Sequence, residues 1–274
     1  MTGTDPTVDP AALLDLAVRG ARLAATELVS RYGRVGALRT KSTVNDPVSE
    51  ADLASEAVLV ELITTERPQD GLLGEEGTDR PSSSGLRWVI DPLDGTVNYL
   101  YRLDNFCVSV AVEDSSGPVA GAVFDPVADR LYAAVRGGGA TLNGDRLQVN
   151  DPVPLDRALL GTGFGYSSGR RAWQGAITGA MLPVARDIRR IGSAALDLCH
   201  VADGTLDGYF EIGLQPWDGA AGMLVVTEAG GVVATRPERD PSDGSSPVRY
   251  LAAGPTLHPA LTATLDRVIA EVAG

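Results

Sequence analysis

Residues 88–96 read Trp88-Val89-Ile90-Asp91-Pro92-Leu93-Asp94-Gly95-Thr96 and join an apolar run to an acidic turn. The apolar run predicts a strand that delivers Asp91 at its carboxyl end. Pro92 stiffens the turn that follows and removes one backbone donor. Asp94 comes three residues after Asp91, so a tight loop can aim both carboxylates at one point. An ordinary Asp-Pro turn with an Asx cap fits the same residues, and the segment alone leaves both interpretations open.

The end of this segment favours an anion site. Gly95 permits close backbone approach, and Thr96 can begin a helix whose free N–H groups would bind an anion. Two carboxylates beside a phosphate site suit Mg²⁺-assisted phosphoryl chemistry, because Mg²⁺ prefers oxygen ligands. The spacing excludes the D-x-D-G-T loop of haloacid-dehalogenase phosphatases, which is one residue shorter. It also excludes an EF-hand, which needs D-x-[DN]-x-[DN]-G.

Three further acidic positions stand at the ends of predicted elements, where site residues are common. Asp52 lies near the start of a helix predicted from Ser49 to about Thr65, and Asp218 begins an apolar helix. Glu75 and Glu76 follow a short strand, and adjacent carboxylates favour a cation as partner. A solvated turn or a helix cap would explain each position taken alone.

The hydrophobic pattern predicts two successive regions of different character. The first contains helices at 10–31 and 49–65, short strands at 72–73 and 87–90, and an antiparallel meander at 106–113, 118–124 and 130–135. The second alternates strands and helices: strands at 158–162, 207–212, 231–234 and 249–253, and helices at 193–202, 217–229 and 257–272. We therefore expect an N-terminal α+β lobe over residues 1–145 and a C-terminal α/β lobe over residues 146–274.

Composition restricts the partners of the chain. A net charge of −13 over 274 residues argues against a nucleic-acid partner. An anionic small substrate remains compatible with this charge if bound cations reverse the local field. Cys107 and Cys199 sit in apolar runs and are expected to be buried thiols, which favours a cytoplasmic location. The N-terminus lacks the pattern of a signal peptide, and no apolar run approaches the roughly 18 residues of a membrane span.

Together the acidic motifs resemble the inositol monophosphatase family, within the superfamily of Mg²⁺-dependent, Li⁺-inhibited phosphatases. The superfamily pattern is D, then E-E, then D-P-[IL]-D-[GS]-T, then W-D-x11-G-G. In this chain it reads Asp52, Glu75-Glu76, Asp91–Thr96, and Trp217-Asp218 with Gly230-Gly231. The resemblance covers roughly residues 40–235, which is most of the chain.

Other segments resemble the inositol-phosphatase subgroup, including its bacterial members. They are Leu160–Tyr166, Arg189–Ala195 and Tyr209–Gly213. Lys41-Ser42 also matches the K-[ST] pair that opens a mobile loop in that family. Pro216 before Trp217 departs from the pattern without removing a ligand.

The resemblance implies a layered αβαβα sandwich, two to three Mg²⁺ ions per site and, as is common in the family, a homodimer. It assigns the first Mg²⁺ to Glu75, Asp91 and the Leu93 carbonyl, and the second to Asp91, Asp94 and Asp218. It implies in-line attack on phosphorus by a metal-activated water. The implied catalytic residues are Thr96, Asp52 and Glu75. The implied substrate contacts are Asp94, Gly95, Thr96, Gly192, Ser193, Ala194 and Glu211.

Inositol monophosphate is the expected substrate, because Glu211 can accept hydrogen bonds from a polyol. The same metal core also serves phosphatases of histidinol phosphate, of 3′-phosphoadenosine nucleotides and of fructose-1,6-bisphosphate, and these stay open as alternatives. A metal-binding scaffold without activity is a further alternative from a different class.

Overall fold

The computed structural model describes most of the chain, namely residues 9–33, 39–40, 47–48 and 50–273. The Lys41-Ser42 pair and the predicted helix cap Ser49 lie outside these residues. A two-stranded antiparallel ladder joins β1 (Arg39–Thr40) to β2 (Pro47–Val48).

The larger sheet has eight strands in the order β10-β9-β8-β7-β6-β5-β3-β4. Their bounds are β3 (Gly71–Gly74), β4 (Asp79–Arg80), β5 (Arg87–Asp94), β6 (Cys107–Asp114), β7 (Gly117–Asp125), β8 (Arg130–Val135), β9 (Gly139–Leu142) and β10 (Asp145–Arg146). Strands β6, β7 and β8 pair antiparallel in sequence, as the predicted meander requires. Strand β3 pairs with β5 in parallel, so the carboxyl ends of these two strands meet at one edge.

The smaller sheet has five strands in the order β12-β11-β13-β15-β14. Their bounds are β11 (Leu159–Thr162), β12 (Asp187–Arg189), β13 (Gly208–Ile212), β14 (Val232–Pro237) and β15 (Val248–Ala253). Strand β11 runs parallel to both β12 and β13, whereas β15 is antiparallel to β13 and β14. We keep the division into lobes 1–145 and 146–274 as a proposal; β10 straddles that boundary.

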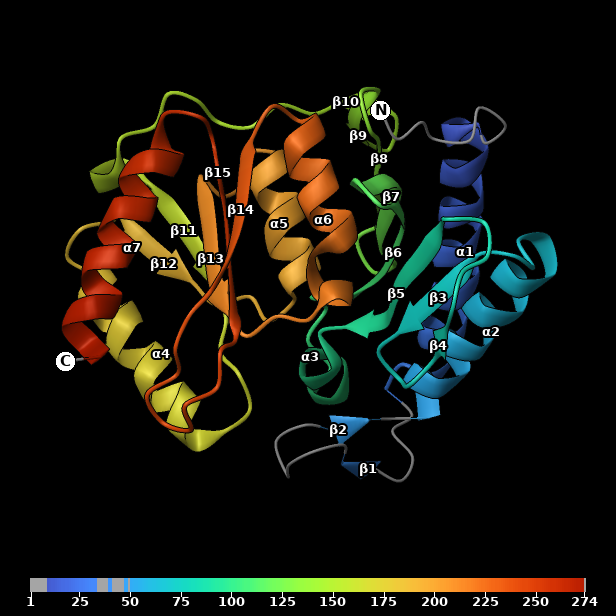
Figure 1. Cartoon of the computed structure of the whole chain (residues 1–274), viewed down its shortest axis with the longest axis horizontal. Helices are drawn as coiled ribbons and strands as arrows, with labels where there is room; N and C mark the ends of the chain where they lie inside the picture. The colour runs from blue at the N-terminus through green and yellow to red at the C-terminus, as the bar shows by residue number, and fades with distance from the viewer. Residues whose placement is uncertain (1–8, 34–38, 41–46, 49, 274) are drawn as a thin grey trace.

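Three helical layers enclose the two sheets and give the αβαβα order (Figure 1). Helices α1 (Pro10–Arg31) and α2 (Glu50–Glu66) cover the outer face of the larger sheet, and α5 (Ala194–Ala202) and α6 (Pro216–Glu228) lie between the sheets. Helices α4 (Ser168–Met181) and α7 (Leu257–Ala273) cover the outer face of the smaller sheet. The layered α/β sandwich expected from the family resemblance is therefore confirmed.

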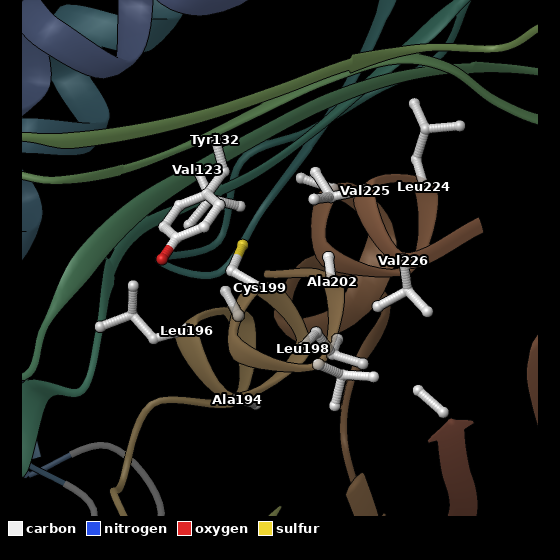
Figure 2. Packing of buried hydrophobic residues seen from close by; sticks show 14 of the residues in the cluster. Val123, Tyr132, Ala194, Leu196, Leu198, Cys199, Ala202, Leu224, Val225 and Val226 are labelled. Carbon is white, nitrogen blue, oxygen red and sulfur yellow. The ribbon is translucent and has the colours of Figure 1, made fainter. Parts of the chain in front are cut away.

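Alternating side chains distribute the strands between three apolar cores. On β6, Val108, Val110 and Val112 pack towards α1 and α2, whereas Cys107 and Ala111 pack towards α5 and α6. Figure 2 shows this central core, where Tyr132 and Val123 of the larger sheet face Leu196, Cys199 and Val225 of the two middle helices. The third core lies between the smaller sheet, α4 and α7. Both faces of the central strands are buried, which explains why β5, β6, β7 and β13 are rich in apolar residues, whereas the edge strands β4, β10, β12 and β14 are largely exposed.

Several elements were not expected from the sequence, among them α4 and β12 of the second lobe. Helix α4 contains Gly169, Gly175 and Gly179, which lower helix propensity by about 1 kcal/mol each. Strand β12 has only three residues, and two of them are charged. Both cysteines are buried and free, as predicted. Within the described part of the chain no helix has the length and apolar character to cross a bilayer.

Candidate active site

The parallel strands β3 and β5 bring Glu75 and Asp91 close together. The Glu75 amide donates to the carbonyl of Ile90 over 3.3 Å, and Asp91 follows Ile90 directly. The buried Asp91 carboxylate accepts a hydrogen bond from the Leu93 amide at 3.0 Å. Strand β5 was expected to end before Asp91, but it continues to Asp94, and its pairing with β6 is irregular between Asp91 and Asp94. The turn expected directly after Asp91 is therefore a bulge at the end of β5.

Gly95 and Thr96 connect this bulge to the short helix α3 (Thr96–Tyr101). Gly95 has a φ of 93°, and a Cβ there would lie 2.8 Å from the Asn105 carbonyl oxygen, so only glycine fits. The Thr96 hydroxyl lies 3.3 Å from Asp52 Oδ1 and 3.1 Å from the Leu93 carbonyl oxygen. Asp52 is fully buried on α2. The predicted pair of water-orienting residues is therefore adjacent.

Asp94 links the end of β5 to the start of α5. Its Oδ2 accepts hydrogen bonds from the Ser193 hydroxyl at 2.6 Å and from the Ala195 amide at 2.7 Å. The Ser193 hydroxyl also accepts from the Leu196 amide as the N-cap of α5. The Cys107 thiol lies 3.9 Å from the same Asp94 oxygen.

Glu211 comes from strand β13 of the smaller sheet, and Asp218 comes from helix α6, which follows that strand in the chain. Asp218 is the third residue of α6 and accepts from the Gln215 amide at 2.7 Å, completing a capping box. Glu211 lies on β13 and accepts from the Tyr209 hydroxyl at 2.5 Å. A Cβ at Gly163 would lie 1.9 Å from Glu211 Oε2, so the glycine leaves the space that this carboxylate fills.

These elements enclose one cavity of about 380 Å³. Nine of the residues singled out from the sequence line it: Glu75, Asp94, Gly95, Thr96, Gly192, Ser193, Ala194, Glu211 and Asp218. Asp52, Asp91 and Leu93 are not among its lining residues and lie buried. Phe164, Tyr166 and Arg190 also line the cavity; they lie in segments that resemble the inositol-phosphatase subgroup but had been given no role. Arg170 lines it as well and had not been singled out from the sequence.

The electrostatics of the cavity are unbalanced towards negative charge. Burial, together with the charges of Glu75, Asp94 and Asp218, raises the pKa of Asp91 well above its usual value. Burial raises the pKa of Asp94 to about 6 even though Ser193 and Ala195 hydrogen-bond to it. Burial and the charges of Asp94 and Glu75 likewise raise the pKa of Asp218. Four carboxylates from three regions of the chain therefore repel one another: Glu75, Asp94 and Asp218 on the wall of the cavity, and the buried Asp91.

Burial also raises the pKa of Glu211 to about 7, although the Tyr209 hydroxyl and the charge of Arg190 act in the opposite direction. This carboxylate lies at the part of the cavity where the substrate contacts were expected.

The donor set fits a divalent cation that prefers oxygen, because four carboxylates and a carbonyl are available and their mutual repulsion would be relieved by positive charge. Among the described residues no three acidic, histidine or cysteine side chains already form a closed metal-binding group. One oxygen of Asp94 and one of Asp218 are engaged with backbone and hydroxyl donors. Their second oxygens are the atoms that would serve as ligands.

Sequence reasoning missed the polar residues that support the site from α2. Ser55 donates to the Pro92 carbonyl at 2.7 Å, and Glu56 accepts from the turn that carries Glu75. Both lie three to four residues after Asp52 on the same helical face. Polar residues repeated at that spacing inside an otherwise buried helix would have indicated them.

Comparisons with known proteins agree with this geometry. The profile of the Inositol monophosphatase family matches residues 9–270. The chain is 44% identical over 258 residues to "Inositol-1-monophosphatase" of Mycobacterium leprae, covering 91% of this chain and 87% of the relative. It is 43% identical over 224 residues to "Nus factor SuhB" of Haemophilus influenzae, covering 81% of this chain and 84% of the relative.

A solved structure of similar architecture is the extragenic suppressor protein SuhB of Bartonella henselae. It aligns with a TM-score of 0.83 and 34% identity, over 93% of this chain and 98% of that chain. The family is generally metal-dependent and supports a phosphatase activity for its members. The motifs, the fold and the matches all converge, and the chain belongs to the inositol monophosphatase family.

Proposed function

We propose that this chain is a Mg²⁺-dependent phosphatase that hydrolyses inositol monophosphate to inositol and phosphate. The observation that carries the proposal is the convergence of Glu75, Asp94 and Asp218, which line the cavity, with the buried Asp91, since each carboxylate disfavours the charged form of another. A bound divalent cation would offset the repulsion between these carboxylates, whereas a neutral ligand would not.

In this proposal the chain's own residues divide the work. Glu75, Asp91, Asp94, Asp218 and the Leu93 carbonyl would hold two Mg²⁺ ions, with a weaker third near Glu75. When bound, Mg²⁺ supplies charge neutralisation of the phosphate oxygens and a water of lowered pKa. Thr96 and Asp52 orient the attacking water through their 3.3 Å contact. The backbone of Gly95 and Thr96 borders the cavity where the phosphate would lie.

The substrate preference rests on lining residues of the cavity that are not metal ligands. Glu211, a half-buried carboxylate, lines the cavity together with Gly192, Ser193 and Ala194. A carboxylate can accept hydrogen bonds from two hydroxyls of a polyol. The Ser193 hydroxyl is already engaged with Asp94, so we expect the backbone of this segment to contact the substrate.

A turnover panel tests the proposal. Purified protein with Mg²⁺ would be assayed for phosphate release from inositol monophosphate, histidinol phosphate, a 3′-phosphoadenosine nucleotide and fructose-1,6-bisphosphate. The proposal expects the highest kcat/KM for inositol monophosphate, loss of activity with EDTA, and inhibition by Li⁺ at the second metal position. A higher kcat/KM for any other member of the panel would contradict the assignment of substrate.

A scaffold without activity remains the alternative from another class, since several relatives, including the one from Haemophilus influenzae, carry the name Nus factor. Protein that binds Mg²⁺ but releases phosphate from no member of the panel would support it. The cytoplasmic location stays a prediction from the two cysteines, and the homodimer stays a prediction from the family resemblance. Light scattering on the purified protein would test the dimer.

A further inference from the structure

Helix α2 presents three buried polar side chains to the site from a single face. Asp52, Ser55 and Glu56 are 0%, 0% and 5% exposed. Their spacing of three and four residues places them side by side. Asp52 lies beside the Thr96 hydroxyl, and Ser55 donates to the Pro92 carbonyl. Glu56 has no part in the chemistry proposed above, yet burying a carboxylate is costly unless it is well hydrogen-bonded.

Both oxygens of the Glu56 carboxylate accept hydrogen bonds from one turn, residues 74–78. Its Oε2 accepts from the Glu76 amide at 2.8 Å. Its Oε1 accepts from the Thr78 hydroxyl at 2.5 Å and from the Thr78 amide at 3.3 Å. Two backbone donors and one side-chain donor of the 74–78 turn therefore point at a single side chain on α2.

The turn has room for this carboxylate because residue 74 is glycine. A Cβ on Gly74 would lie 2.7 Å from Glu56 Oε2. The turn is closed by its own backbone, since the Gly74 amide donates to the Thr78 carbonyl at 2.7 Å. Gly77 supplies the positive φ of 108° that such a tight turn requires. The shape of the turn and the position of Glu56 are thus mutually dependent.

Glu75 sits between the two anchors of this turn. Its amide is held by the Ile90 carbonyl of β5, and the next amide along the chain, that of Glu76, is held by Glu56. We propose that Glu56 is a positioning residue that fixes the 74–78 turn and thereby aims Glu75 into the metal site. This inference rests on the metal-dependent phosphatase function proposed above.

The chemistry of the contact requires a carboxylate. All three partners of Glu56 are donors, and a carboxylate accepts through both oxygens. In Glu56→Gln the amide NH₂ would face either the Glu76 amide or the Thr78 donors, so one donor–donor contact is unavoidable. Glu56 holds the backbone beside Glu75 and not the Glu75 carboxylate itself, so we expect the lower end of the roughly 10–100-fold loss in metal affinity that is typical when outer-shell partners of a ligand are removed.

Calorimetric titration of the full chain with Mg²⁺ tests the inference directly. We expect Glu56→Gln to raise the Mg²⁺ Kd by about 10-fold. The Mg²⁺ concentration for half-maximal phosphate release should rise in parallel, while KM for inositol monophosphate at saturating Mg²⁺ stays unchanged. Thr78→Val removes one donor and keeps the charge, so it should shift the Kd in the same direction by less. Glu61→Gln, on the exposed side of α2, is the control and should leave the Kd unchanged.

The outcomes separate this inference from the function on which it rests. A folded Glu56→Gln protein with the wild-type Kd would overturn the positioning role, provided that Glu75→Gln loses binding. A shift in Glu56→Gln with none in Thr78→Val would assign the effect to charge alone and would also overturn it. If Glu56→Gln does not fold, an unchanged Kd in Thr78→Val overturns the inference. Wild-type protein that binds no Mg²⁺ would overturn the proposed function as well.

Discussion

The Ser193 hydroxyl donates to Asp94 Oδ2 over 2.6 Å and so links the start of α5 to the last residue of β5. The same hydroxyl caps α5 by accepting from the Leu196 amide. Ser193 therefore connects a helix of the middle layer with a predicted metal ligand of the larger sheet. One substitution at this position should affect both stability and metal binding.

We expect Ser193→Ala to destabilise the protein by about 1 kcal/mol through the lost helix cap. It should also weaken Mg²⁺ binding by about 10-fold, because Asp94 loses a partner that orients it. Chemical denaturation and calorimetric titration measure the two effects separately. Ser167→Ala, which removes the cap of α4, is the matched control and should lose comparable stability with an unchanged Mg²⁺ Kd. Equal Mg²⁺ affinities in the two variants would contradict the link through Asp94.

Asp91→Asn should separate function from stability. Asp91 is 1% exposed and is repelled by three other carboxylates, so removing its charge relieves repulsion in the metal-free protein. We expect the variant to lose phosphate release and tight Mg²⁺ binding, while its Tm in EDTA rises by about 2–4 °C, roughly 1 kcal/mol. Differential scanning calorimetry with and without Mg²⁺ measures this. A variant with near wild-type turnover would refute the metal assignment.

The proximity of the candidate residues could be predicted from the sequence where they are local. Asp91, Asp94 and Thr96 lie within six residues, so their closeness follows from the chain itself. Glu75 was singled out because a short strand ends at two adjacent carboxylates, and only the parallel pairing of β3 with β5 shows that it lies beside Asp91. Asp218 and Glu211 come from distant elements, and for these the family resemblance supplied what local patterns could not.

The parts that sequence reasoning missed have identifiable physical reasons. The apolar face of α4 repeats at Trp173, Ile177 and Met181, which are buried. Its glycines mask that repeat when helix propensity is considered alone. Glu56 is a charged residue in a helix, and such residues are usually solvated. Only the tertiary contact with the 74–78 turn makes it a buried acceptor.

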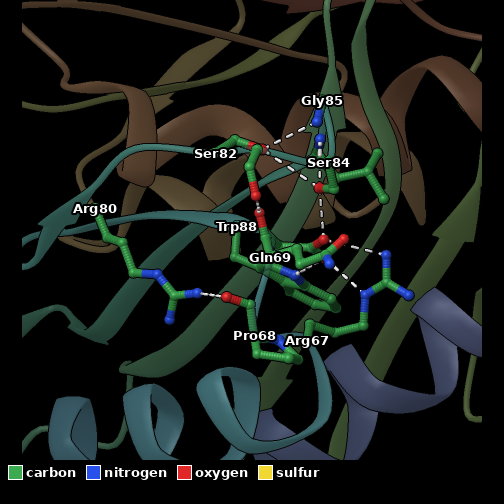
Figure 3. A network of polar contacts seen from close by, with 11 residues as sticks. Arg67, Pro68, Gln69, Arg80, Ser82, Ser84, Gly85 and Trp88 are labelled. Carbon is green, nitrogen blue, oxygen red and sulfur yellow. Dashed lines mark hydrogen bonds and ion pairs between the residues drawn. The ribbon is translucent and has the colours of Figure 1, made fainter.

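Asp70 should make the stability of the protein depend on pH in the acidic range. Its carboxylate accepts from Arg67 at 2.8 Å, from Trp88 at 2.9 Å and from Ser84 at 2.6 Å. Figure 3 shows Arg67, Ser84 and Trp88 gathered in this network at the start of β3 and β5. Burial opposes ionisation, but these hydrogen bonds outweigh it and lower the pKa of Asp70.

Because the pKa of folded Asp70 lies below the unfolded value of about 3.9, its stabilisation is present above roughly pH 4 and is lost as the pH falls through the folded pKa. We expect Asp70→Asn to destabilise the protein by about 1–3 kcal/mol at pH 7. The difference from wild type should shrink as the pH falls below about 4. Urea unfolding at several pH values measures it. A difference that is constant from pH 7 to pH 3 would show that packing, and not the charge, is responsible.

Gly163→Ala tests the polyol contact without touching the metal ligands. The added Cβ would lie 1.9 Å from Glu211 Oε2, so the carboxylate must move and its hydrogen bond with Tyr209 must change. We expect KM for inositol monophosphate to rise by about 10-fold, equivalent to about 1.4 kcal/mol. Turnover of p-nitrophenyl phosphate, which has no polyol hydroxyls, should be nearly unchanged.

Gly175→Ala on the exposed side of α4 is the matched control, because no atom lies within 4 Å of its added Cβ. It should leave both substrates unaffected and stabilise the helix by about 1 kcal/mol. If Gly163→Ala slowed both substrates equally, Glu211 would act on the reacting phosphate and not on the alcohol. If it slowed neither, the Glu211 carboxylate would have no part in recognising the polyol. The preference for inositol monophosphate would then come from other residues that line the cavity, such as Phe164, Tyr166 and Arg170.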